Sequence, residues 1–106
     1  MKTISIKNKE YLLKYTLRAF FIFENMTGYS FKFGTVLDEY LLFYSMLLAN
    51  NAGFDTPFDE FINLCDESPA LFKEFKDFFL KEVDLQMQLT SQSDASSVKK
   101  KTKRKK

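Results

Sequence analysis

Three pairs of adjacent carboxylates, at residues 38–39, 59–60 and 66–67, are the groups whose types and spacing could do chemistry. Paired carboxylates can bind a divalent cation or act as a general acid and base. Two of these pairs fall in the first turns of expected helices, where negative side chains stabilise the positive end of the helix dipole. The third lies in an expected turn between helices. We therefore interpret all of them as helix-stabilising or solvated charges.

The other groups that usually carry enzymatic chemistry are scarce. The chain has no histidine and one cysteine, Cys65, which excludes a structural zinc site and a cysteine–histidine nucleophile pair. Helical spacing places this cysteine beside Phe58, Phe61 and Ile62, so a small buried thiol is expected. The glycines are too widely spaced for a phosphate-binding or dinucleotide-binding loop. We expect a protein without catalytic activity, cofactor or metal.

Charge is divided unevenly along the chain. Seven of its 16 cations fall in residues 99–106, and the other nine share the rest of the chain with all 14 acids, so that part has a net charge of −5. This basic tail lacks the aromatic residues that stack on bases, so any contact with nucleic acid or another polyanion would be non-specific. Equally, it could neutralise the acidic body or keep it soluble. The candidate polyanion-contact residues are Lys99, Lys100, Lys101, Lys103, Arg104, Lys105 and Lys106.

The elements that must position these groups begin with a predicted β-hairpin over residues 2–15, where two short apolar runs flank an Asn-containing polar turn. A first helix should begin after Thr16 as N-cap and end at Gly28. Its phenylalanines, including Phe21, lie on more than one face. We expect them to be buried between the hairpin and the next helix.

The second predicted helix, residues 36–51, is apolar nearly all round and should therefore be central. Thr35 and Asp38 have the spacing of a capping box at its start. Its apolar stretch, residues 40–49, is shorter than the ~20 residues that a membrane span needs. With the single cysteine, this favours a soluble protein of a reducing cytoplasm.

Proline marks the start of the last two predicted helices, after Thr56 and after Ser68, because proline is favoured in the first helical turn. The fourth helix should end at about Leu89. The following segment, residues 90–106, has too few apolar residues to offset the entropy of ordering, and a disordered tail is expected. The sequence thus predicts one compact domain over residues 1–89, mainly α-helical with an N-terminal β-hairpin and about four helices.

Three segments, taken in order, resemble a known family. They are KYTLRAFFIFENMTGYSF, LLFYSMLLANN and FDEFINLCDESPALFKEF. Their order and spacing are similar to those of small tail assembly chaperones of long-tailed, siphovirus-type bacteriophages and prophages, over about residues 1–80. The lysine-rich tail departs from that family's pattern.

The resemblance implies a non-catalytic role in the cytoplasm of a bacterial host. Such chaperones bind the long tape measure protein, keep it soluble and help to recruit the tail tube protein, and they tend to self-associate. Many are made in two lengths through a programmed ribosomal frameshift. A chaperone for a long apolar helical client needs exposed apolar surface, and the fourth helix is the candidate to supply it. The candidate partner-binding residues are Phe72, Phe75, Phe78 and Phe79, for which ordinary core packing is the alternative.

Two other functions stay open. The basic tail would suit a small nucleic-acid-associated or regulatory protein, although the acidic body would repel phosphate. A structural head–tail connector subunit would differ from a chaperone by remaining in the finished virion.

Overall fold

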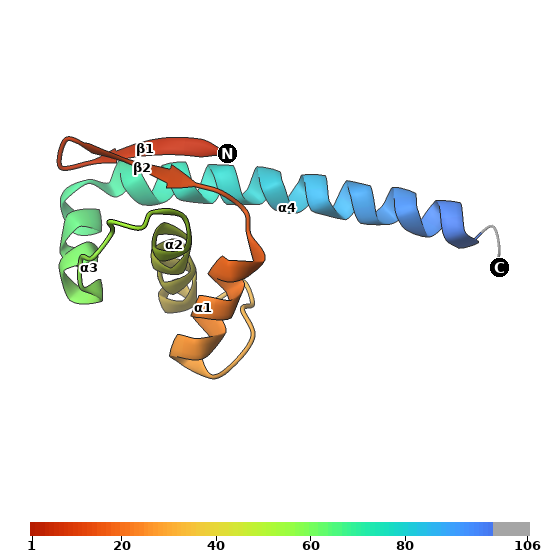
Figure 1. Ribbon diagram of the computed structural model, residues 1–106, viewed down its shortest axis with the longest axis horizontal. Coiled ribbons are helices and arrows are strands. Elements are labelled where there is room, and N and C mark those ends of the chain that lie inside the picture. Colours follow the sequence, from red (N-terminus) through yellow and green to blue (C-terminus); the bar gives the residue numbers. More distant parts are fainter. Residues whose placement is uncertain (99–106) are drawn as a thin grey trace.

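The computed structural model describes the backbone of residues 1–98 and the side chains of residues 1–87. This part of the chain forms an N-terminal two-stranded hairpin followed by four helices, as the sequence predicts (Figure 1). In chain order the elements are β1 (Lys2–Ile6), β2 (Lys9–Leu13), α1 (Leu17–Thr27), α2 (Val36–Asn50), α3 (Phe58–Glu67) and α4 (Pro69–Val98).

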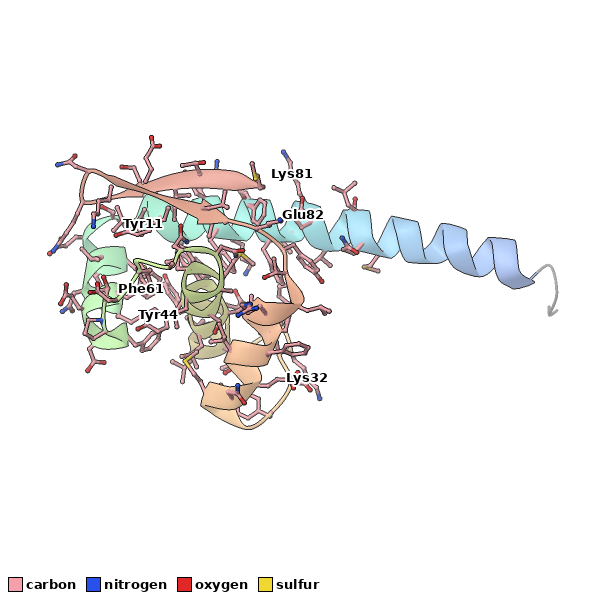
Figure 2. The ribbon with its side chains drawn as sticks, in the orientation of Figure 1. Tyr11, Lys32, Tyr44, Phe61, Lys81 and Glu82 are labelled. Atoms are coloured by element: carbon pink, nitrogen blue, oxygen red, sulfur yellow. The ribbon has the colours of Figure 1, made fainter. Side chains whose placement is uncertain are left out.

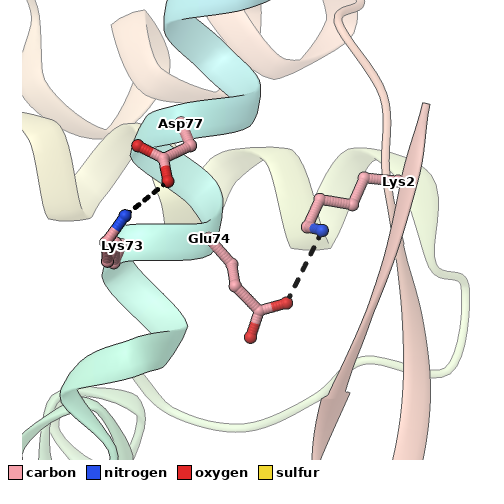
Figure 3. Close-up of polar contacts among 4 residues, drawn as sticks. All are labelled: Lys2, Lys73, Glu74 and Asp77. Carbon is pink, nitrogen blue, oxygen red and sulfur yellow. Dashed lines mark hydrogen bonds and ion pairs between the residues drawn. The ribbon is translucent and has the colours of Figure 1, made fainter.

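The hairpin is antiparallel, with Lys2 opposite Leu13. Its two-residue turn places Lys7 and Asn8 at φ values of 52° and 65°, a left-handed geometry that matches the right-handed twist of the strands. The hairpin lies along α4 (Figure 1). At this contact the ammonium of Lys2 lies 3.7 Å from the carboxylate of Glu74, and both side chains are partly exposed (Figure 3).

The predicted caps of α1 are confirmed. The Thr16 hydroxyl accepts a hydrogen bond of 3.3 Å from the amide of Ala19. At the other end Gly28 takes a φ of 84°, and its amide donates to the carbonyl of Glu24 at 2.7 Å. A left-handed residue at this position satisfies a terminal carbonyl of the helix, and glycine adopts it with least strain.

Helix α2 is the centre of the fold, as its all-round apolar character predicts. It packs against α1, α3, α4 and β2. Leu42, Phe43 and Met46 are fully buried on it. Just beyond its last turn, the side chain of Asn51 bonds both backbone groups of Leu12 and so joins α2 to the hairpin. Two strands alone are only marginally stable in water, and these contacts hold the hairpin in place.

The predicted capping box of α2 is wrong. Thr35 immediately precedes the helix, but its side chain makes no capping hydrogen bond. Asp38 is buried and accepts a hydrogen bond of 2.7 Å from the hydroxyl of Tyr29 instead. The carboxylate therefore ties the α1–α2 connection to the start of α2.

The start of α3 also differs by one residue from its prediction. Pro57, rather than Thr56, is the N-cap residue. The carbonyl of Pro57 accepts the first helical bond, from the amide of Phe61, and the carbonyl of Thr56 accepts a hydrogen bond from the hydroxyl of Tyr44. The start of α4 at Pro69 agrees with the prediction.

Helix α4 is long and extends beyond the rest of the molecule (Figure 1). It runs to Val98, past the predicted end near Leu89. The predicted disordered tail, residues 90–106, therefore includes a segment whose backbone continues α4. Residues 99–106 lie outside the described residues.

Candidate partner-binding surfaces

Three of the four phenylalanines proposed as partner-binding residues lie in the hydrophobic core. Phe75, Phe78 and Phe79 are 1%, 7% and 2% exposed. The ring of Phe75 stacks on Phe43 of α2, with 4.6 Å between centroids, and on Phe79, with 5.5 Å. These side chains hold α4 against the rest of the domain. A partner could reach them only if α4 moved, and their contact with a partner stays a prediction.

Phe72, the fourth of these residues, is half-buried at the contact between α2 and α4. Its ring is nearly parallel to that of Tyr40, with 4.1 Å between centroids and an interplanar angle of 13°. The ammonium of Lys76 lies 5.7 Å from the Phe72 centroid and also pairs with the carboxylate of Glu39. Phe72 therefore contributes to an aromatic and ionic contact within the domain.

Large apolar side chains are exposed elsewhere. They lie on α1, on the α1–α2 connection, at the start of α2 and on α4: Leu17, Phe21, Met26, Tyr29, Phe33, Val36, Leu37, Leu80, Leu85 and Met87. Single exposed apolar side chains are ordinary, whereas contiguous apolar patches on a protein surface often mark contact sites. The described surface thus offers apolar contact at sites other than the predicted one.

The outer side of α1 is one such surface, here called the α1 face. Leu17 and Phe21 lie one turn apart on it and are 72% and 59% exposed. The expected burial of Phe21 is therefore wrong, whereas Phe23, on the opposite side of the helix, is fully buried against the core. Glu24 shares the outer face by helical spacing, and that charge was the signal that this side meets water.

A groove between α2 and α3 is the second apolar surface, here called the α2–α3 groove. Its volume is about 420 Å³, and its apolar lining consists of Val36, Leu37 and Tyr40 from α2 and Phe58, Ile62 and Cys65 from α3. Asp66 lies at its edge. Val36 and Leu37 are 70% and 55% exposed, so much of the lining is open to a partner.

Aromatic packing fixes the two walls of this groove relative to each other. On the inner side of α3, Phe61 lies 5.4 Å from Tyr44 of α2, centroid to centroid (Figure 2). Phe58, at the lip, lies 5.2 Å from the same tyrosine. Helical spacing placed Phe58, Phe61, Ile62 and Cys65 on one apolar stripe, and the thiol was expected to be buried. In the structure Phe61 and Cys65 are buried, and the other two side chains are only partly covered.

The chemistry of these surfaces is that of contact. Burial, and next the charge of Asp66, raise the pKa of the Cys65 thiol to about 11, so it stays protonated and unreactive at neutral pH. The hydrogen bond to Asp38 is the main cause that raises the pKa of the Tyr29 phenol. Among the described residues, no three histidine, cysteine or carboxylate side chains gather as metal ligands. In the same part of the chain, no helix combines the length and the apolar content that crossing a membrane requires.

The basic tail cannot be placed on any of these surfaces. Its candidate residues, 99–106, lie outside the described residues.

Comparison of the chain with protein-family models, with curated proteins and with solved structures found no match.

Proposed function

We propose that this protein is a phage tail assembly chaperone that binds the tape measure protein and keeps it soluble during tail morphogenesis. The proposal starts from the order of the three sequence segments quoted above. The observation that carries it is the set of large apolar side chains left in water on the α1 face, in the α2–α3 groove and along α4. A protein that shields a long apolar helix needs surfaces of this kind.

The charge of the domain supports the same role. Outside residues 99–106 the chain has nine cations and 14 acids, so the surfaces that carry the apolar side chains belong to a body with net negative charge. Charge of one sign keeps a protein with exposed apolar groups from associating indiscriminately. A client held on such a body would share its solubility.

A pull-down tests the proposal. The full chain, tagged at its N-terminus, should retain the tape measure protein encoded by a long helical reading frame next to its own gene. Retention at about 0.5 M salt is expected, because apolar contact survives the screening of charges. Absence of any association would end the proposal.

The two other functions predict different results. A nucleic-acid-associated protein would retain DNA or RNA in a salt-dependent way and no tape measure protein. A connector subunit would be abundant in purified virions by mass spectrometry, whereas a chaperone should be scarce there. Either result would replace the proposed function.

A further inference from the structure

The α2–α3 groove has the form of a site for one more helix. Its walls are two helices that each present apolar side chains one turn apart, such as Val36 with Tyr40 and Phe58 with Ile62. Ridges and grooves of this spacing are what a third helix packs into. An extended segment would fit less well. The backbone groups of both walls are already hydrogen-bonded within their own helices, so they offer few partners to the unpaired backbone of a strand.

Helix α3, one wall of the groove, carries Asp59, Glu60, Asp66 and Glu67 and has no lysine or arginine. Asp66 lies at the edge of the groove, and helical spacing places Asp59 on the same side of α3 and the two glutamates on the opposite side. Within residues 1–87, none of these four carboxylates has a cation in ion-pair contact. By contrast, Glu39 on α2 is paired with Lys76. The α3 wall therefore favours a partner that brings positive charge.

We infer that the α2–α3 groove binds an amphipathic helix whose apolar face is flanked by lysine or arginine. This inference rests on the proposed function, and it names the part of the client that the groove would take. Apolar side chains of the client helix would lie against Leu37, Tyr40 and Ile62. Its cations would lie beside Asp66 and Asp59, where charge complementarity accelerates association and selects the partner.

The basic tail of a second copy is the competing occupant. It carries enough positive charge, but residues 99–106 contain no apolar side chain to fill the groove. Apolar burial contributes about 25 cal/mol for each Å² removed from water, and the tail would forgo that contribution. A helix with both features matches the lining better than the tail does.

Binding of synthetic peptides to the full chain tests the inference. The probe is a fluorescent helical peptide of about 18 residues with leucines on one face and lysines beside them, long enough for about five turns. Its binding should weaken by about tenfold when the lysines are replaced by glutamates, and by a similar factor when a peptide of residues 99–106 is used instead. Equal affinity for the glutamate peptide or for the tail peptide would overturn the inference.

Matched variants locate the contact. Leu37→Ser should weaken binding of the lysine peptide by about tenfold, because an exposed leucine that becomes buried in a complex stabilises it by roughly this factor or more. Leu17→Ser makes the same change at an exposed position on the α1 face, outside the groove, and should weaken binding of this peptide much less than Leu37→Ser does. Both replaced side chains are more than half exposed, so both variants should fold. An unchanged affinity for Leu37→Ser would overturn the inference.

Charge reversal provides a second, independent variant. Asp66 is exposed at the edge of the groove, and Asp66→Lys should reduce the preference for the lysine peptide over the glutamate peptide. Glu24→Lys on α1 makes an equivalent change outside the groove and should have no such effect.

Failure of the inference is distinct from failure of the proposed function. If Leu37→Ser retains the tape measure protein as well as the natural chain does, only the groove assignment falls.

Discussion

Asn51 joins the end of α2 to the edge of the hairpin, and its replacement by alanine should destabilise the domain. Its side-chain oxygen accepts from the amide of Leu12 at 2.8 Å. Its side-chain nitrogen donates to the carbonyls of Leu12 and Leu47, each at 3.0 Å. One side chain thus supplies partners to the outer edge of β2 and to the last turn of α2.

The size of the effect follows from these bonds. A hydrogen bond of this kind contributes about 0.5–1.5 kcal/mol net, and Asn51→Ala also leaves partly buried backbone groups of Leu12 without their partner, so we expect a loss of about 2–3 kcal/mol. In a domain of this size such a loss lowers Tm by about 10–20 °C. The Asn51→Asp variant should be no more stable than Asn51→Ala, since a carboxylate cannot donate to the two carbonyl oxygens that it would face.

Urea and thermal unfolding followed by circular dichroism measure this loss. Asn63→Ala is the matched control, because Asn63 is exposed on α3 and alanine has the higher helix propensity. Its unfolding free energy should be equal to or slightly above that of the natural chain. An Asn51→Ala variant within about 0.5 kcal/mol of the natural chain would refute the reasoning, since that is the usual range for neutral surface substitutions.

Three further predictions concern two local features, the Cys65 thiol and the hairpin turn. Because its pKa is raised from 9.0 to about 11, the Cys65 thiol should react with a thiol reagent roughly a hundredfold more slowly in the folded chain than in the unfolded chain. The contribution of this thiol to stability is complete below pH 9 and is lost as the pH rises toward 11, so the natural chain should lose more stability than Cys65→Ala over that interval. Asn8→Gly should raise the unfolding free energy by roughly 0.5–1 kcal/mol, because glycine suits the left-handed turn; a lower Tm would contradict this view of the hairpin.

Local signals in the sequence were sufficient for the elements and most of their ends. The hairpin, the caps at Thr16 and Gly28 and the helix start at Pro69 depend on neighbouring residues, so their physics is visible in a short window. Long-range partners were not visible in this way. Asp38 accepts a hydrogen bond from Tyr29 in place of the expected capping box. That bond depends on how the α1–α2 connection folds, which a short window of sequence does not show.

The orientation of apolar faces was the larger source of error. Helix α1 has apolar residues on several sides, and spacing alone could not tell which side the core would cover, so Phe21 was wrongly expected to be buried. On α4, sequence spacing brought Phe75 and Phe79 together correctly but could not show that Phe75 stacks against Phe43 in the core. The α2–α3 groove depends on how two helices pack, which no single helix pattern contains.

Co-expression with the tape measure protein tests the central claim most directly. The soluble fraction of that protein should rise severalfold with the natural chain. A control in which Leu17, Leu37 and Leu85 are changed together to serine removes exposed apolar side chains from α1, α2 and α4 without opening the core. This control should fold and lose most of the gain in solubility. A tape measure protein that stays insoluble with the natural chain, or that is equally soluble with the control, would contradict the account.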